Sequence, residues 1–252
     1  MLSGAQSKAP MTAITPRHRR WILALIFFCL VATGRADETR PIPPFEARYR
    51  IYQADIPVGE VILQLEYEDA ERYRMRSSLS VSGLARLIDA RSEKEEVEGK
   101  IVGGVPRPLR YRAERTGNKT RKVSLDFAWD RGEVTSVVNE ETSTITLGTR
   151  TVDPLSLYLL TMLDLHSDRP ADAYNVVARG RLKTYQIRPL GETTIPTPMG
   201  KLATLSFARQ RPESSKAATF WHAPELNFLP VQVSNTKDGE ETSRLVIDHL
   251  AR

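Results

Sequence analysis

One apolar helix constrains the fold of this chain more than any other segment. The residues from Asp153 to Leu165, DPLSLYLLTMLDL, begin with an aspartate suited to an N-cap and a proline suited to the first helical position. Eight of the eleven residues from Leu155 to Leu165 are apolar, so the polar stripe is too narrow for a surface helix. Burying eight such side chains contributes on the order of 12–24 kcal/mol, as an upper bound. The rest of the chain must therefore cover this helix.

The segments on either side of the helix alternate apolar and polar residues, as strands with one wet face do. Residues 45–53, 60–68 and 72–81 indicate an antiparallel meander. Further strands are expected at 107–115, 120–129, 133–138, 143–147, 173–178, 182–189, 193–196, 200–209, 216–222, 230–236 and 241–250. Roughly a dozen strands or more predict an all-β, mainly antiparallel fold, an open or spiral β-barrel-like curved sheet wrapped around one central α-helix.

Two segments depart from this alternation. Residues 83–90, GLARLIDA, predict a short helix. The charged segment Ser92–Gly99 contains EKEEVE and, if it is a strand, is expected at an edge of the sheet, where charges are tolerated. Its carboxylates could hold a divalent cation weakly, but a solvated edge is the preferred interpretation.

Residues 1–36 have the features of a cleaved secretory signal. A basic cluster at 17–20 precedes twelve apolar residues, Trp21–Ala32, and small residues follow at 34 and 36. An uncleaved N-terminal membrane anchor is the alternative. Cys29 lies inside the apolar run, which disfavours lipidation. Residues 37–44 predict an extended proline-rich lead, so 45–252 are expected to form a single β-rich periplasmic domain.

The leader accounts for the basic pI of the chain. The whole chain has 36 basic and 31 acidic residues, and residues 1–36 contain five basic residues and no acidic one. The remainder is therefore neutral, and the pI gives no argument for a nucleic-acid partner. The one cysteine leaves with the leader, so the mature chain has neither a disulfide nor a thiolate nucleophile.

The sequence carries no catalytic or metal-binding signature. His166, His222 and His249 lie singly in separate segments and not at the spacing of metal ligands. No Gly-x-Ser-x-Gly elbow and no glycine-rich phosphate loop occurs. We therefore expect no enzyme activity, no cofactor and no metal. If the protein is an enzyme, its candidate residues are the dispersed carboxylates Asp126, Asp153 and Glu225.

The dry faces of the strands carry large apolar side chains, with Leu109 among them. In a closed sandwich these side chains form the core, whereas in an open barrel they line a groove partly filled by the helix. The groove candidates are Tyr49, Leu63, Tyr73, Tyr111, Phe127, Trp129, Tyr158, Met162 and Trp221. Arginines at 72–76 and 110–112 occupy wet faces, either as solubilising residues or as contacts to anionic headgroups.

Several short motifs occur in a specific order. They include Phe45-Glu46-Ala47-x-Tyr49, Pro57-Val58-Gly59-Glu60, Arg107-Pro108-Leu109-Arg110-Tyr111, Asp153-Pro154-Leu155-Ser156-Leu157 and Trp221-x-Ala223-Pro224-Glu225-Leu226. In this order, over about Pro44 to Leu250, they resemble the domain-of-unknown-function 3108 family of exported proteobacterial envelope proteins. The resemblance implies a periplasmic β-rich domain without an established activity. It also implies a fold similar to that of the open-barrel lipoprotein carriers.

These observations predict a periplasmic, non-enzymatic envelope protein that binds a lipid, a lipoprotein or an apolar polypeptide in a groove of the curved sheet. The alternative is a structural or scaffolding partner that acts through an edge strand or through the arginine-rich strand faces. An outer-membrane barrel is disfavoured, because its outward faces would be apolar.

Overall fold

The structure, a computed structural model, describes residues 40–83, 91–118 and 120–252. The expected leader at 1–36, with Cys29, and positions 37–39 of the lead lie outside the described residues. The same holds for the expected helix at 83–90, apart from Gly83.

Fifteen strands of the described residues form one sheet, in the order β8-β7-β6-β5-β4-β3-β2-β1-β15-β14-β13-β12-β11-β10-β9. The strands are β1 (Phe45–Gln53), β2 (Ile56–Tyr67), β3 (Arg72–Val81), β4 (Ser92–Val102), β5 (Val105–Thr116), β6 (Arg121–Ala128), β7 (Glu133–Val138), β8 (Glu141–Thr146), β9 (Thr151–Val152), β10 (Ala173–Ala178), β11 (Arg181–Thr197), β12 (Gly200–Gln210), β13 (Lys216–Ala223), β14 (Leu229–Lys237) and β15 (Glu240–Ala251). All neighbours pair antiparallel except β9 and β10, which are parallel.

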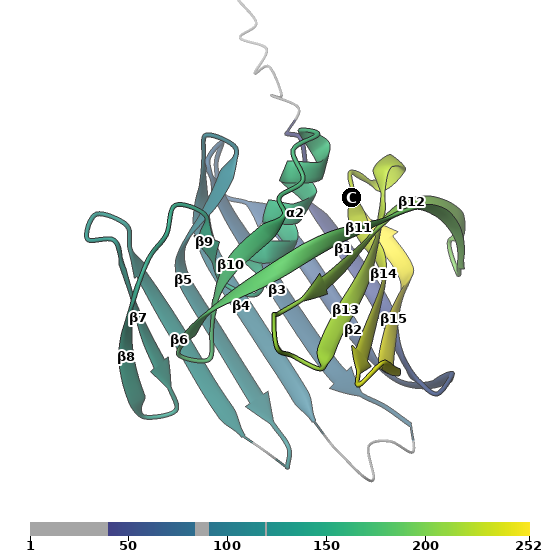
Figure 1. The fold of residues 1–252 in the computed structure, drawn as a ribbon, viewed down its shortest axis with the longest axis horizontal. Coiled ribbons are helices and arrows are strands. Elements are labelled where there is room, and N and C mark those ends of the chain that lie inside the picture. Colours follow the sequence, from purple (N-terminus) through teal and green to yellow (C-terminus); the bar gives the residue numbers. More distant parts are fainter. Residues whose placement is uncertain (1–39, 84–90, 119) are drawn as a thin grey trace, which may run out of the picture. The chain divides into compact units, whose positions relative to one another are not determined.

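The sheet curls without closing, since β8 and β9 stand at its two ends. Figure 1 shows the sheet curving around the helix α2 (Ser156–His166). At the seam, the turn between β10 and β11 approaches the β7–β8 hairpin: a methyl group on Gly180 would lie 3.5 Å from both Ser143 Oγ and Val138 Cγ2. The predicted open, barrel-like sheet around a central helix is confirmed.

The helix α2 is capped and buried as its sequence predicts. Oδ1 of Asp153 accepts hydrogen bonds from the backbone N–H groups of Leu155 (2.8 Å) and Ser156 (3.0 Å), so Asp153 satisfies two donors that the first turn leaves free. Leu159 and Leu160 are completely buried. No helix of the described residues is long and apolar enough to cross a membrane.

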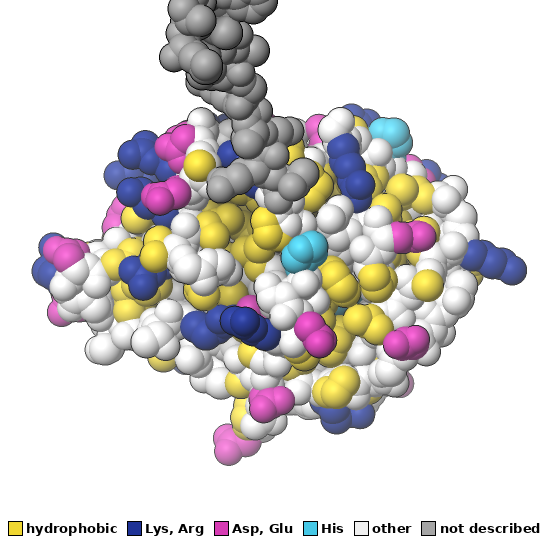
Figure 2. Space-filling model, turned by 90° about the horizontal axis from the view of Figure 1, so that it is seen from above, with side chains coloured by type: hydrophobic (Ala, Val, Ile, Leu, Met, Phe, Trp, Pro, Cys, Tyr) yellow, Lys and Arg dark blue, Asp and Glu magenta, His cyan; other side chains and the backbone are white. Residues whose placement is uncertain are grey.

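The side chains packed on α2 come from alternate positions of the strands. Ala47, Leu63, Met75 and Val97 are all at most 4% exposed and belong to one core with Leu159. The same alternation sends charged residues outward. On the face seen from above in Figure 2, hydrophobic side chains gather in the middle and charged side chains lie mainly around them.

The expectation that Ser92–Gly99 lies at an edge is wrong. These residues belong to β4, which pairs with β3 on one side and β5 on the other. A strand this acidic is tolerated inside the sheet because Glu96 and Glu98 stand opposite Arg76 and Arg74 of β3. Val97 points the other way and is completely buried.

The expectation that Leu109 lies on the dry face is also wrong, since Leu109 is 41% exposed. The register between β4 and β5 shifts at this point: Glu98 pairs with Arg110 and Gly99 with Pro108, so Leu109 is the extra residue of a bulge. Alternation resumes on either side, where Pro108 and Tyr111 are buried.

The strands expected at 182–189 and 193–196 are one strand, β11. A second register shift, between Pro189 and Gly191, lets this strand bend while it stays paired with β12. A short 3-10 helix, η1 (Pro224–Leu226), connects β13 and β14.

Candidate functional site

The nine groove candidates all lie in the core around α2. Tyr49, Leu63, Tyr73, Tyr111, Phe127 and Met162 are buried, and Trp129, Tyr158 and Trp221 pack against them. Several of their polar atoms have protein partners: Tyr49 donates to the carbonyl of Pro230 (2.9 Å) and Trp129 Nε1 to that of Pro108 (2.7 Å). The structure therefore brings the nine residues together in a packed interior. Two cavities lie beside this interior: Tyr111 lines the first and Tyr158 lines the second.

A cavity of about 470 Å³ lies on the concave side of the sheet, between β4–β6 and β10–β14 and beside Pro154 at the start of α2. We call it the cationic chamber. Seven basic side chains line it, against two acidic ones, Glu93 and Glu95. The basic residues are Arg115, Arg121, Arg179, Lys183, Arg209, Arg211 and Lys216.

The first wall of the chamber follows from strand register. Arg115 of β5 stands directly opposite Arg121 of β6 on one side and Glu93 of β4 on the other. Alternation places Arg115 on the face of Tyr111, and Arg121 on the face of Val123. Two like charges directly across a strand pair destabilise a sheet. The repulsion between Arg115 and Arg121 therefore has to be offset by another interaction.

The second wall is formed mainly by β11, β12 and β13. The guanidinium of Arg209 lies over the rings of Tyr185 (5.0 Å) and Phe220 (4.5 Å), in cation–π contact. Burial lowers the pKa of Arg209. The pKa of Lys183 is also lowered, first by burial and then by the neighbouring charges of Arg179 and Arg211.

The cations of the chamber outnumber its two carboxylates, Glu93 and Glu95. Within the described part of the chain, none of the seven side chains forms an ion pair with a carboxylate. Nε of Arg115 and Nη2 of Arg121 are buried and have no hydrogen-bond partner among the residues that the structure describes. Burial, Arg179 and Arg115 together lower the pKa of Arg121. Such groups cost stability unless something else satisfies them.

A hydrogen-bonded pair, Tyr111 and Glu95, adjoins the cations. The hydroxyl of Tyr111 donates a hydrogen bond to Glu95 Oε1. Burial raises the pKa of Glu95 to about 7, and the carboxylates of Glu93 and Asp153 add to this shift. Glu95 is therefore partly protonated near neutral pH, and the chamber becomes more cationic as the pH falls.

This shift predicts how stability depends on pH. A carboxyl whose pKa rises from 4.5 to about 7 on folding binds its proton more tightly in the folded state, so the free energy of unfolding falls as the pH rises through that window. Glu95→Gln should remove this contribution and be more stable than wild type at pH 8. Urea unfolding at pH 5 and pH 8 checks this; identical pH profiles for the two proteins would contradict it.

An apolar crevice adjoins the chamber and shares Arg209 with it. It lies between α2 and β10–β13 and is narrow, with about 30 Å³ of free space. Tyr158 of α2 meets Phe220 of β13 edge-on, with ring centroids 6.3 Å apart. Tyr158, Ala171, Ile187 and Phe207 are only partly buried, which leaves apolar surface along the crevice.

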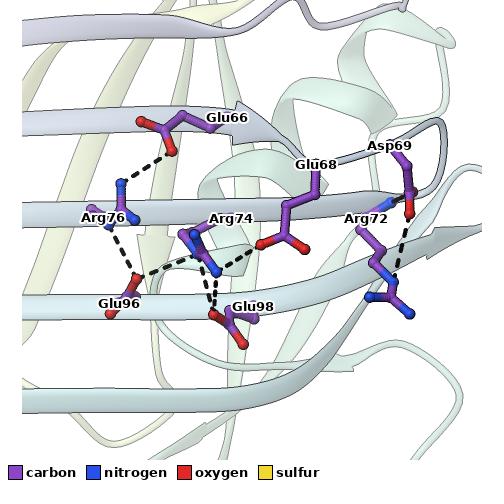
Figure 3. A network of polar contacts seen from close by, with 8 residues as sticks. All are labelled: Glu66, Glu68, Asp69, Arg72, Arg74, Arg76, Glu96 and Glu98. Atoms are coloured by element: carbon purple, nitrogen blue, oxygen red, sulfur yellow. Dashed lines mark hydrogen bonds and ion pairs between the residues drawn. The ribbon is translucent and has the colours of Figure 1, made fainter.

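The outer face carries charges of a different kind, because they are paired. Arg74 Nη2 contacts Glu98 (2.5 Å) and Glu68 (2.6 Å), and Arg76 contacts Glu66 and Glu96 at 3.1 Å each (Figure 3). A hollow of about 560 Å³ on this face is lined by similar pairs, such as Lys122 with Glu114 (3.3 Å). The outer arginines are thus largely neutralised.

The carboxylates considered for catalysis do not meet. Asp126 pairs with Arg110 and Arg112 on the outer face, Asp153 is the buried helix cap, and Glu225 is exposed in η1. Burial raises the pKa of Asp153, whose Oδ2 has no hydrogen-bond partner.

The three histidines are also apart in the structure. His166 and His249 are exposed, whereas His222 is buried, with Nδ1 at 2.8 Å from the carbonyl oxygen of Phe228. Burial lowers the pKa of His222 to about 4, so its ring is neutral. Among the described residues, no group of three or more His, Cys, Asp or Glu side chains could hold a metal ion.

Sequence reasoning missed the cationic chamber. The alternation that marks Tyr111 and Val123 as inward also marks Arg115 and Arg121, so part of the signal was present. The second wall comes from strands beyond the helix, and only the curl of the sheet brings the two walls together.

The comparisons with known proteins concern fold and family. The structure is similar to a β-barrel-like protein of the domain of unknown function DUF1849 from Brucella abortus, at a TM-score of 0.53 and 11% identity, over 82% of this chain and 96% of that one. It matches a candidate exported protein with a YmcC-like fold from Bacteroides fragilis at a TM-score of 0.34 and 10% identity, over 82% and 95% of the two chains. A candidate lipoprotein from Parabacteroides distasonis matches at 0.35 and 11% identity, over 84% and 98%.

Among curated proteins no significant match is found. The family model described as "Protein of unknown function (DUF3108)" matches residues 48–246, which is most of the chain and agrees with the motifs quoted above. The chain belongs to the DUF3108 family.

Proposed function

We propose that this protein is a non-enzymatic binding protein of the cell envelope that holds a lipid-like ligand on the concave side of its sheet. The observation that carries the proposal is the junction at Arg209, where the cationic chamber meets the apolar crevice. A ligand with a polar head and an apolar chain can place its head in the chamber and its chain along the crevice. Among a lipid, a lipoprotein and an apolar polypeptide, this junction favours ligands with an acyl chain.

The crevice supplies the apolar part of this site. Its lining includes Tyr158, Ala171, Ile187 and Phe207, all partly exposed. A chain laid along them would cover apolar surface at about 25 cal/mol for each Å² removed from water. The free space of about 30 Å³ is small, so the bound chain has to spread these walls.

Two observations support the location and the absence of catalysis in this proposal. The chain begins with a segment that has the features of an export signal, at 1–36. The carboxylates Asp126, Asp153 and Glu225 each have a separate structural setting, so they offer no paired acid and base.

A scaffolding function through the edge of the sheet is the second candidate. Among the described strands, β8 ends the sheet and pairs only with β7, so its other edge could accept a partner strand. The arginine faces favour this candidate less, because Arg74 and Arg76 are engaged by glutamates.

Filling the crevice should weaken lipid binding. Ala171→Trp places a large ring in the crevice, whereas Ala173→Trp places the same ring at the exposed start of β10 and serves as the matched control. With a short-chain lysophosphatidylglycerol as the probe, isothermal titration calorimetry should show about tenfold weaker binding for Ala171→Trp only. Thermal unfolding verifies that both variants fold. Equal affinities, or no binding by the wild type, would contradict the proposal.

A further inference from the structure

We propose that the cationic chamber is a binding site for a phosphate-type oxyanion, and that the head of the bound ligand carries a phosphomonoester, phosphodiester or diphosphate group. This inference rests on the proposed function, because it names the chemistry of the ligand's polar end. It is carried by the excess of basic side chains in the chamber and by two buried guanidinium nitrogens that have no hydrogen-bond partner among the described residues.

The charge of the chamber calls for an anion. Seven basic side chains face two carboxylates, although the domain beyond residue 36 is neutral overall. The excess is therefore concentrated at one place on the concave side. On the outer face the arginines have glutamates within ion-pair distance, such as Arg76 with Glu96 at 3.1 Å. The outer arginines are thus neutralised, whereas the arginines of the chamber form no ion pair with any described residue.

The free donors are guanidinium N–H groups, which phosphate oxygens accept hydrogen bonds from. Nε of Arg115 and Nη2 of Arg121 are buried and lack a partner in the described part of the chain, and the two residues are direct cross-strand neighbours. Guanidinium groups bind phosphate through paired, charge-assisted hydrogen bonds. Two neighbouring guanidinium groups can thus share the oxygens of one phosphate group.

The opposite wall offers cations from β11 and β12. Arg209 is held over two aromatic rings, and Lys183 lies close enough to Arg179, Arg211 and Arg121 for their charges to act on it. Lys183 and Arg121 come from the two halves of the sheet. An anion between them would join the walls and remove their mutual repulsion.

The chamber is large enough to hold a small molecule and not only a single ion at the surface. At about 470 Å³ it falls in the range of roughly 300–1,000 Å³ typical of small-molecule sites. Glu93 and Glu95 form part of the chamber wall, and Tyr111 holds the carboxylate of Glu95 in place through a hydrogen bond. A negatively charged head contacts the basic residues and keeps away from these carboxylates.

The first experiment uses inorganic pyrophosphate with the complete mature chain. Isothermal titration calorimetry should detect binding, with an affinity that falls as sodium chloride is added. Arg121→Gln and Lys183→Gln, one on each wall, should each weaken binding by about tenfold or more, because each removes a charge-assisted contact. Arg110→Gln, on the outer face, is the matched control and should bind like wild type. Equal pyrophosphate affinities for all four proteins would overturn the inference.

Melting temperatures show whether a variant that binds weakly has lost the charge contact or has lost its fold. Without ligand, Arg121→Gln and Lys183→Gln should melt at a higher temperature than wild type, because each removes a partly buried cation that neighbouring cations repel. Pyrophosphate should raise the melting temperature of wild type and have little effect on the variants. A variant that melts lower than wild type and still gains stability from pyrophosphate would contradict the assignment.

A second arm distinguishes a lipid headgroup from a free phosphate compound. A lysophosphatidylglycerol and a monoacylglycerol with the same chain are compared on wild type and on Arg121→Gln. If the lysophosphatidylglycerol binds more tightly than pyrophosphate and loses affinity in the variant, both the inference and the proposed function stand. If pyrophosphate binds and neither lipid does, the phosphate site stands and the proposed function fails. If both lipids bind wild type and variant equally, the phosphate site fails and the proposed function stands.

Discussion

Leu159→Ala should lower the free energy of unfolding by about 2–5 kcal/mol, because it opens a cavity at the point where the sheet packs on α2. Leu159 is completely buried and belongs to the same core as Tyr49, Leu63 and Met75, which come from β1, β2 and β3. The surrounding strands are linked to one another by hydrogen bonds, so they can collapse only partly into the space. Urea unfolding followed by circular dichroism measures the change.

Lys201→Ala on β12 is the control for this change, since Lys201 is exposed and a surface substitution shifts stability by at most about 0.5 kcal/mol. If Leu159→Ala were as stable as Lys201→Ala, α2 would not be held by the sheet as described. The packing of the strands around the helix would then have to be reconsidered.

Gly99→Ala is expected to destabilise the protein by about 1–3 kcal/mol, since an added Cβ would be forced into a packed site. That Cβ would lie 2.6 Å from Cζ of Tyr73 and 2.7 Å from the backbone oxygen of Arg107. Tyr73 cannot easily give way, because it is 1% exposed and its hydroxyl is hydrogen-bonded to Ser156 Oγ at 2.7 Å. Differential scanning calorimetry should show a clear fall in melting temperature.

Gly148→Ala provides the matched comparison for Gly99→Ala. The nearest atom to a Cβ at Gly148 is the hydroxyl oxygen of Thr151, at 3.3 Å, which is a much milder contact. Equal melting temperatures for the two variants would show that the bulge beside Gly99 is looser than the contacts with Tyr73 indicate.

The regular strands could be predicted from the sequence because apolar and polar residues alternate along them with a period of two. The strands at 45–53 and 72–81 are found with the expected bounds, since each alternates cleanly between a buried and a wet face. The helix was predictable from its apolar residues and its Asp153 cap. These features depend on neighbours in the chain and not on the curl of the sheet.

The irregular part could not be predicted, because it depends on partners that are distant in the sequence. Ser92–Gly99 reads as an exposed edge until Arg74 and Arg76 are placed opposite its glutamates. Leu109 reads as a buried residue until the bulge opposite Glu98 and Gly99 turns it outward. In both cases the pairing register of β4 decides the outcome.

The candidate site is harder still to read from the sequence. Arg115 and Arg121 fall on inward positions, but a charge at the end of a strand usually points to solvent. Lys183 and Arg209 lie far along the chain, and the chamber exists only where the sheet brings them toward β5 and β6. The groove candidates were chosen for apolar size, and the structure places them in the packed core.

Native mass spectrometry of the protein purified gently from cells that produce it from the full sequence tests the central claim most directly. We expect a bound species with the mass of a phosphate-bearing lipid on wild type and on Arg110→Gln, which changes only an exposed residue of the outer face. We expect loss of that species from the double variant Arg121→Gln, Lys183→Gln. Wild-type protein without any bound lipid, or a double variant that carries the same lipid as wild type, would contradict the claim.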